Sequence, residues 1–217
     1  MFNSKKILIV SSDVIGDKMA GPAIRYYQMA LVLSKTNDVT LLIPNEVTSF
    51  SELNMMKLSR KTLKKCMGNA EIVIIQGMTL FKYSFLKQFK GSLIIDLYDP
   101  TMLEMLEVRD NKFEFNIDLE IVKEQLRYGD YFICASEKQK DLWIGMLLAI
   151  GRILPNDYIH DKKLNHLIGI VPFGVEKREP TKSFNPYKKF PDINEEDKIL
   201  LWGGGIWDWL DPFTLIE

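Results

Sequence analysis

Short runs of consecutive apolar residues alternate along the chain with longer segments in which apolar positions recur at helical spacing. The short runs are rich in Ile, Leu and Val and lack the polar alternation of half-exposed strands, which is typical of parallel strands buried on both faces. The longer segments have the length of crossover helices. The pattern therefore predicts an α/β fold built on a Rossmann-like, doubly wound parallel sheet.

The individual elements follow from the same pattern. The expected strands lie at Lys6–Ser12, Asp38–Pro44, Glu71–Gln76, Ser92–Leu97, Asp130–Ala135 and Leu167–Pro172. The expected helices lie at about Gly21–Ser34, Ser49–Met67, Leu80–Phe89, Ile117–Tyr128 and Glu137–Leu148. Two helix starts pair a hydroxyl with a side-chain acceptor three positions later, so that each can satisfy a free backbone amide of the first turn. These pairs are Ser49 with Glu52 and Ser136 with Gln139.

The composition changes sharply after residue 175. Residues 176–197, EKREPTKSFNPYKKFPDINEED, carry three prolines, many charges and little apolar periodicity, which is typical of a linker. Residues 198–217 then read as an apolar strand, a glycine turn and the start of a helix. Because a lone strand cannot bury both of its faces, we expect residues 198–217 to begin a second α/β domain that is truncated here.

The overall charge excludes some classes of partner. The 28 Lys and Arg residues nearly balance the 29 Asp and Glu residues, so the chain has no strong field that would favour nucleic acid. The amino-terminal apolar run is too short for a signal peptide, and no apolar stretch approaches the ~18 residues of a membrane span. We therefore expect a cytoplasmic protein.

Metal and disulfide chemistry have little support in the sequence. Cys66 and Cys134 are the only cysteines and lie far apart, which does not fit a disulfide framework. His160 and His166 are six residues apart, which is not an adjacent-turn helical spacing, and they lack a third ligand. We predict no metal.

The three consecutive glycines Gly203–Gly205 follow the apolar run of the last segment. Without side chains, their backbone amides can approach a phosphate at the amino end of a following helix. A sharp turn without a ligand is the alternative interpretation.

A glycine-bearing loop follows the first strand and contains Gly16, Asp17 and Gly21. Pro22 suits a first helical turn, and Gly21 can adopt backbone angles that are closed to other residues. Arg25 lies one turn into the helix, where its fork could bind a phosphate or carboxylate, although an ordinary surface arginine is the alternative.

The strand expected at Ser92–Leu97 ends in a polar group formed by Asp96, Tyr98 and Asp99. Ligands of open α/β sheets bind at this carboxyl edge, so these side chains are candidate site residues. For Asp99, which precedes Pro100, a helix cap is the favoured alternative.

Four segments, in order, resemble bacterial GT-B glycosyltransferases of the family 4 type. They are KILIVSSDVIGDKMAGPAIRYYQMALVL, IIDLYDPTMLEMLE, YFICASEKQKDLWIGML with the later VPFGVE, and WGGGIWDWLDP. The resemblance covers roughly residues 5 to 217 and implies that the chain is the amino-terminal half of such an enzyme, plus the start of its second domain. The family's Glu-x7-Glu signature belongs to that second domain, so the fragment alone is expected to be inactive.

The resemblance also assigns roles to residues. It implies transfer of a sugar from a nucleotide-sugar to a saccharide or lipid-linked acceptor, with retention of configuration, in cell-envelope polysaccharide or glycolipid synthesis. The donor's phosphates would meet Gly203, Gly204, Gly205, Trp207 and Asp208, and the acceptor would meet the Gly16–Arg25 loop and the Asp96–Asp99 edge. Many members carry a histidine near the Asp-Leu-Tyr-Asp-Pro segment, and its absence leaves the catalytic residue unknown, with Asp99 as a candidate. No cofactor beyond the donor is implied.

A basic cluster in the expected Ser49–Met67 helix suggests a further contact. It consists of Lys57, Arg60, Lys61, Lys64 and Lys65, interspersed with Leu58 and Leu63, and it could touch anionic lipid on the inner face of a membrane. A solvated helix face is the favoured alternative.

Two other functions compete with glycosyl transfer. A nicotinamide-dependent oxidoreductase is disfavoured because the first turn lacks G-x-G-x-x-G and because Pro44-Asn45 stands where an acidic ribose-binding residue is expected. A non-catalytic saccharide-binding or partner-docking module shares the same fold and remains an alternative.

Overall fold

The computed structural model describes residues 3–47, 53–175, 179, 181, 190, 192–194, 196–207 and 210–216. The chain divides into two units, Met1–Phe173 and Gly174–Glu217. The sequence places the end of the first domain at residue 175. The two units are described separately below.

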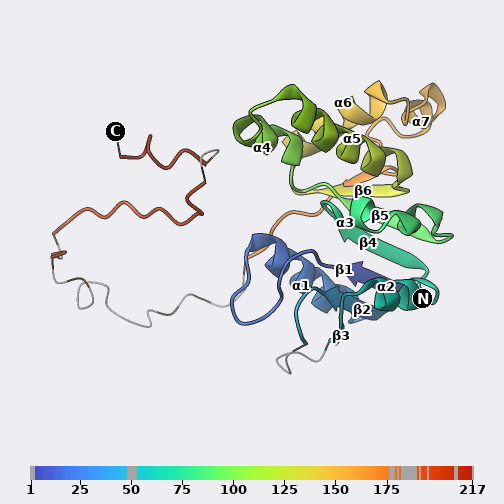
Figure 1. Cartoon of the computed structure of the whole chain (residues 1–217), viewed down its shortest axis with the longest axis horizontal. Helices are drawn as coiled ribbons and strands as arrows, with labels where there is room; N and C mark the ends of the chain where they lie inside the picture. The colour runs from blue at the N-terminus through green and yellow to red at the C-terminus, as the bar shows by residue number, and fades with distance from the viewer. Residues whose placement is uncertain are drawn as a thin grey trace. The chain divides into compact units, whose positions relative to one another are not determined.

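The first unit is built on one seven-stranded sheet in which every pairing is parallel (Figure 1). The strands lie in the order β3-β2-β1-β4-β5-β6-β7. The order reverses between β1 and β4. The chain adds β2 and β3 on one side of β1 and then adds β4, β5, β6 and β7 on the other side. The predicted Rossmann-like α/β class is confirmed. The strands are β1 (Lys6–Val10), β2 (Asp38–Ile43), β3 (Asn54–Lys57), β4 (Ile72–Gln76), β5 (Ser92–Asp96), β6 (Tyr131–Cys134) and β7 (Ile168–Ile170).

The continuous apolar runs form these strands because both faces of the sheet are covered near its centre. In β1, Leu8 and Val10 pack in one core, whereas Ile7 and Ile9 pack in the other. The strand pairs with β2 on one side and β4 on the other, so that Ile7 lies opposite both Val39 and Ile72. This burial on both faces explains why the run shows no polar alternation.

The helices divide between the two faces. Helix α1 supplies Ala23, Tyr26 and Ala30 to one core, and the remaining long helices supply the other core through residues such as Leu63, Leu126 and Trp143. The helices are α1 (Gly21–Leu33), α2 (Arg60–Met67), α3 (Thr79–Lys82), α4 (Thr101–Val108), α5 (Lys112–Tyr128), α6 (Glu137–Ala149) and α7 (Pro155–His160).

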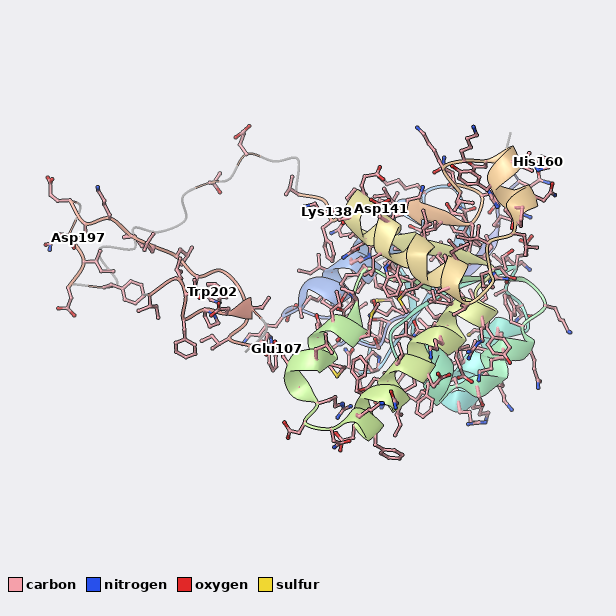
Figure 2. The ribbon with its side chains drawn as sticks, turned by 90° about the horizontal axis from the view of Figure 1, so that it is seen from above. Glu107, Lys138, Asp141, His160, Asp197 and Trp202 are labelled. Carbon is pink, nitrogen blue, oxygen red and sulfur yellow. The ribbon has the colours of Figure 1, made fainter. Side chains whose placement is uncertain are left out.

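Helix α6 has one face buried against the sheet and one face exposed to solvent. Trp143 and Leu147 are buried against the sheet, whereas Lys138 and Asp141 project from the opposite surface (Figure 2). Ser136 caps the helix as predicted, because its Oγ accepts from the backbone N of Gln139 at 3.2 Å. The Gln139 side chain reaches back one residue further than expected, accepting from the backbone N of Ala135 at 2.7 Å.

The predicted helix Ser49–Met67 is wrong in its described first half. Residues Asn54–Lys57 form β3, an edge strand paired only with β2. The helix begins at Arg60 because Ser59 is its N-cap, with Ser59 Oγ accepting from Thr62 N at 3.0 Å. The pair Ser49 and Glu52 lies outside the described residues.

Three further departures concern short elements. The segment expected to be one helix at Leu80–Phe89 forms the four-residue α3 and a 3-10 turn at Ser84–Gln88. The helices α4 and α7 are not among the predicted elements. Both begin at a proline boundary, with Pro100 as the N-cap of α4 and Pro155 in the first turn of α7.

The second unit differs from its prediction. Where described, residues 198–207 form no strand, and no α-helix follows them between residues 210 and 216. The side chains of Leu200 and Leu201 are 77% and 86% exposed. The physical reason is that a strand requires a neighbouring strand to pair with, and no strand pairing of the described structure involves this segment.

Candidate functional site

The carboxyl ends of β1, β4 and β5 surround a cavity of about 160 Å³. The cavity lies where the strand order reverses, which is the position at which open α/β sheets bind ligands. Its polar lining includes Ser12, Asp13, Gln76, Asp99 and Gln125. Its apolar wall includes Pro22 from α1, Leu97, Val122 from α5 and Trp143 from α6. The fold thus brings residues distant in sequence to one edge of the sheet.

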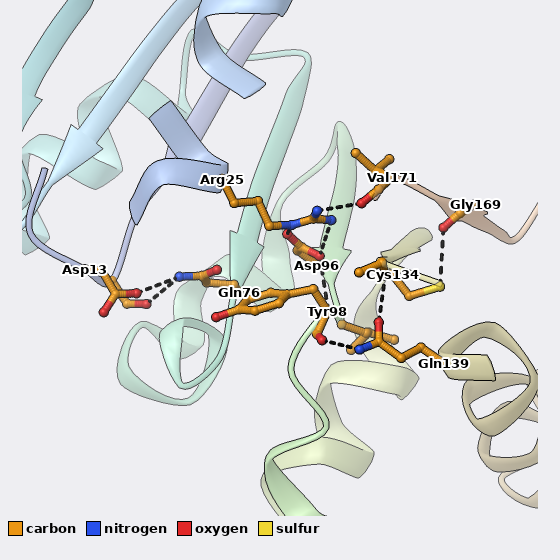
Figure 3. Close-up of polar contacts among 12 residues, drawn as sticks. Asp13, Arg25, Gln76, Asp96, Tyr98, Cys134, Gln139, Gly169 and Val171 are labelled. Atoms are coloured by element: carbon orange, nitrogen blue, oxygen red, sulfur yellow. Dashed lines mark hydrogen bonds and ion pairs between the residues drawn. The ribbon is translucent and has the colours of Figure 1, made fainter. Parts of the chain in front are cut away.

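Arg25 and Asp96 form a buried ion pair at this cavity, which Asp96 lines (Figure 3). Arg25 Nε donates to Asp96 Oδ2 at 2.6 Å and Nη2 donates to Oδ1 at 3.1 Å, which makes the pair bidentate. Nη1 donates to the carbonyl oxygen of Val171 at 2.5 Å. The guanidinium donors that the sequence suggested for a ligand are therefore bonded within the protein. The alternative prediction, an ordinary surface arginine, is also wrong, because Arg25 is only 5% exposed.

Aromatic rings and backbone groups complete the environment of this ion pair. The Arg25 guanidinium lies 5.4 Å from the ring centroid of Tyr98 and 5.2 Å from that of Phe173. Tyr98 also donates its backbone N–H to Asp96 Oδ1 at 3.2 Å. Burial raises the pKa of Asp96, and the hydrogen bond and charge of Arg25 oppose that shift. The cluster joins α1 to the ends of β5 and β7, which is a structural role.

Gln76 ends β4 and is only 4% exposed. Its Nε2 donates to Ser12 Oγ and to Asp13 Oδ2, both at 3.0 Å. Its Oε1 has no hydrogen-bond partner among the residues that the structure describes. The next residue, Gly77, lines the cavity and has a φ of 52°, a left-handed conformation that favours glycine.

Two carboxyl groups adjoin one another at this edge. Asp99 lines the cavity, and Glu104 on α4 shares a side-chain hydrogen bond with it. Burial, the hydrogen bond to Asp99 and the charge of Asp99 raise the pKa of Glu104 to about 7. Burial also raises the pKa of Asp99, and the charge of Asp13 adds to the shift. Asp99 does not cap α4, whose N-cap is Pro100 without a side-chain cap.

Tyr98 extends from the end of β5 toward Gln76 and Asp13 in Figure 3. Its ring packs edge-on against Phe173, with centroids 5.6 Å apart. Burial, followed by the charges of Asp99 and Asp13, raises the pKa of the Tyr98 hydroxyl. The hydroxyl is therefore a neutral hydrogen-bond donor at physiological pH.

The loop predicted to line a cleft contributes only partly. Pro22 lines the cavity and occupies the first turn of α1, as its sequence position predicts. Gly16, Asp17 and Gly21 are not among the residues that line it. Gly21 is the first residue of α1 and has no positive φ, so its conformational freedom is not used.

Asn45 holds the same loop from the end of β2. Its Oδ1 accepts from Ile15 N at 3.1 Å and its Nδ2 donates to Ile15 O at 2.9 Å. This side chain stands where a nicotinamide-binding fold needs an acidic residue, and it braces the backbone instead.

The glycine segment belongs to the second unit. Gly203, Gly204 and Gly205 are exposed, and the indole Nε1 of Trp202 donates to the carbonyl oxygen of Gly205 at 3.0 Å. Trp207 is 58% exposed, and Asp208 lies outside the described residues. The described segment forms a turn, without the helix that the predicted phosphate cradle requires.

The predicted basic cluster is largely engaged with its own chain. Lys57 pairs with Glu46, and Arg60 and Lys64 lie 5.2 Å and 5.1 Å from the ring centroid of Phe85. Throughout the described part of the chain, no helix is long and apolar enough to cross a membrane.

The histidines lie apart from the cavity, at α7 and in the loop after it. His160 Nδ1 is 2.8 Å from Asn156 O, and His166 Nδ1 is 3.3 Å from Asp161 Oδ2. Across the ranges that the structure describes, no group of three or more His, Cys, Asp and Glu side chains is arranged to hold a metal ion.

Sequence reasoning identified Asp96, Tyr98 and Asp99 but missed Asp13, Gln76 and Glu104. A usable signal existed for two of these, because Asp13 and Gln76 are polar residues at the carboxyl ends of apolar strands, as Asp96 is. Glu104 carried no such signal, since its position depends on the unpredicted helix α4.

Comparison with known proteins adds no identification. No protein-family model matches the chain, and no curated protein matches it.

Proposed function

We propose that this chain is the acceptor-side half of a glycosyltransferase of the GT-B type. The full enzyme transfers a sugar from a nucleotide-sugar to a saccharide or lipid-linked acceptor, with retention of configuration, in cell-envelope polysaccharide or glycolipid synthesis. The observation that carries the proposal is the polar cavity at the point where the strand order reverses. It lies beside the Asp-Leu-Tyr-Asp-Pro segment, one of the four that resemble the family.

In this reaction an acceptor hydroxyl oxygen bonds to the anomeric carbon of the donor sugar, and the bond from that carbon to the diphosphate oxygen breaks. The diphosphate leaves with the bonding electrons, and the hydroxyl proton must be taken up. The Asp99–Glu104 pair is the candidate acceptor of that proton, because a carboxyl whose pKa lies at about 7 suits proton transfer near neutral pH.

The glycine segment Gly203–Gly205 is assigned to the donor's phosphates on the strength of the resemblance. The three glycines are exposed and carry no side chains that would keep a phosphate from the backbone. The arrangement needs no metal, since backbone amides and positive side chains can stabilise a departing diphosphate. Cytoplasmic location, with contact to the inner face of a membrane through α2, belongs to the same proposal.

The test is a transfer assay on the protein at its full natural length, with UDP-, GDP- and TDP-sugars and mixed saccharide acceptors. Donor-specific release of nucleoside diphosphate that depends on acceptor supports the proposal. A Gly204→Leu variant should lose donor turnover without losing acceptor binding. Absence of release from every donor, combined with retained saccharide binding, would favour the alternative of a non-catalytic saccharide-binding module.

A further inference from the structure

We propose that Gln139, in the first turn of α6, is a positioning residue for the Asp99–Glu104 carboxyl pair, because it holds the backbone of Tyr98 and so places the next residue, Asp99, against Glu104. The inference deepens the proposed function, on which it rests for the use of the pair in proton transfer. The positioning itself can be tested without a donor sugar.

The side chain of Gln139 bridges two turns at the carboxyl edge of the sheet. Its Nε2 donates to the carbonyl oxygen of Tyr98 at 2.7 Å (Figure 3). Its Oε1 accepts from the backbone N of Ala135, also at 2.7 Å. The orientation of the amide is fixed, because the carbonyl needs a donor and the N–H needs an acceptor. The bridge therefore ties the turn after β5 to the turn after β6.

The bridge is preorganised at its α6 end. Ser136 Oγ accepts from the backbone N of Gln139 at 3.2 Å, so the main chain of Gln139 is held as well as its side chain. One turn later, Trp143 Nε1 donates to the carbonyl oxygen of Leu97 at 2.8 Å. Because residues four apart share one face of a helix, α6 presents two donors to consecutive carbonyls after β5.

The segment that these bonds hold leads directly into Asp99 and α4. The N-cap of α4 is Pro100, which makes no side-chain cap, and the helix buries only Met102. Helix α4 thus has little burial of its own to fix it. We therefore expect the placement of Asp99 against Glu104 to follow the position of the segment that Gln139 holds.

The carboxyl pair itself gives the reason why holding this segment matters. Two carboxyl groups repel each other when both are ionised, so they adjoin only where the surrounding structure keeps them together and a proton is shared. Burial, the hydrogen bond to Asp99 and the charge of Asp99 raise the pKa of Glu104 to about 7. The effects of Asp99 require adjacent carboxyl groups, whereas a released segment would let them separate into solvent.

The other charged groups around the pair come from different elements. The charge of Asp13, which follows β1, acts on the pair, and Asp96 at the end of β5 is bonded to Arg25 of α1. The Tyr98 hydroxyl is neutral because its pKa is raised. Replacement of Gln139 by an uncharged residue changes none of these charges. The cavity residues from α5 and α6 do not titrate; they are Val122, Gln125 and Trp143.

The experiment follows the side-chain carboxyl carbons of the isotopically labelled chain by NMR while the pH is varied. The Glu104 signal is identified as the one that Glu104→Gln removes. Gln139→Met removes both side-chain hydrogen bonds of the bridge. It should lower the pKa of Glu104 from about 7 by at least about one pH unit, toward the ordinary value of 4.5. An unchanged Glu104 titration in the folded variant would overturn the inference.

Asn37→Leu is the matched control, at the opposite, amino edge of the sheet. Asn37 Oδ1 accepts from the backbone N of Lys5 at 3.1 Å, and its Nδ2 donates to the carbonyl oxygen of Leu33 at 3.0 Å. Asn37 is half-buried, as Gln139 is, and makes the same two kinds of bond. Its replacement should lower stability but leave the Glu104 titration unchanged. An equal shift in both variants would show that Gln139 acts only through general stability and would overturn the positioning role.

Gln139→Asn is a second variant, which keeps the amide but shortens the side chain by a methylene. The shorter amide should not reach both Ala135 and Tyr98, so the pKa of Glu104 should fall in the same direction. A titration equal to that of the unaltered chain would contradict the need for a bridge between the two turns.

The outcomes separate this inference from the proposed function. A lowered Glu104 pKa in Gln139→Met, without turnover of any donor by the full-length protein, would retain the positioning role and overturn glycosyl transfer. Donor turnover with an unchanged Glu104 titration would remove the positioning role and leave the glycosyltransferase proposal intact. If both hold, the acid limb of the rate profile should move to lower pH in Gln139→Met, because the ionised carboxyl group is the form that accepts a proton.

Discussion

Two groups of buried polar residues lie at the same edge of the sheet, and they differ in how completely the protein satisfies them. The Arg25–Asp96 pair is closed, because the guanidinium meets a carboxylate, a carbonyl and two aromatic rings. The Gln76–Asp13 group lines the same cavity as Asp96 but keeps one buried acceptor, Gln76 Oε1, without a partner among the described residues. A fully paired polar cluster stabilises the fold, whereas one that keeps an unpaired buried acceptor contributes less to stability. The following predictions test that distinction.

The largest effect is expected from Asp96→Ala. The change leaves the Arg25 guanidinium buried without its counter-charge, so the free energy of unfolding should fall by about 3–5 kcal/mol. Urea denaturation followed by circular dichroism measures this loss. Lys5→Ala, which removes an exposed ion pair with Glu71, is the matched control and should cost less than about 1 kcal/mol. Similar losses for both variants would show that burial does not distinguish the pairs.

A smaller loss is expected from Arg25→Lys. Lysine keeps the charge but cannot form the bidentate bond to Asp96 while also reaching Val171 O. With hydrogen bonds to charged groups worth about 1.5–3 kcal/mol, the free energy of unfolding should fall by about that amount. The same urea titration measures it, and a stability equal to that of the unaltered chain would contradict a structural role for the fork.

The carboxyl pair Asp99–Glu104 should make stability depend on pH. Because the folded-state pKa of Glu104 is raised to about 7 from an ordinary value of 4.5, the folded chain holds this proton more tightly than the unfolded chain. The contribution of Glu104 to stability is therefore complete below about pH 4.5 and is lost as pH rises through about 7. The difference in free energy of unfolding between the unaltered chain and Glu104→Gln, measured from pH 4.5 to 8, should shrink for this reason. A difference that is constant with pH would show that Glu104 has an ordinary pKa.

The smallest effect on stability is expected from Gln76→Met. The change removes two hydrogen bonds from Nε2 but also removes the unpartnered Oε1, so the opposing effects should leave stability within about 1 kcal/mol. Thermal unfolding without sugar measures this. A loss as large as that of Asp96→Ala would show that Gln76 is a structural residue of the closed kind.

The sequence predicted the central part of the fold well. The strands β1, β2, β4, β5, β6 and β7 lie within the expected ranges, because continuous apolar runs have few alternatives in a buried parallel sheet. It was wrong at β3, a short segment that the pattern assigned to the helix expected at Ser49–Met67. An edge strand such as β3 pairs on one side only, and its position depends on β2, a tertiary contact that local pattern does not encode.

The site was predicted less completely, for a related reason. Asp96, Tyr98 and Asp99 were found because they end a recognisable strand, but the partners of their side chains come from α1, α4 and the segment after β7. Whether Arg25 faces a ligand or Asp96 depends on the crossing of α1 over the sheet, which spacing along the chain does not determine. The strand expected after residue 197 is absent from the described residues 198–207, because a strand needs a paired neighbour.

The most direct test of the proposed acceptor site is a map of backbone and glutamine side-chain amide shifts as neutral monosaccharides are titrated onto the isotopically labelled chain. The account predicts that the largest shifts occur at the Gln76 side-chain amide, Gly77 and Tyr98–Asp99, around the reversal of strand order. Shifts confined to other surfaces, such as the basic helix α2, or no shifts at saturating sugar, would contradict the assignment of the cavity as the binding site.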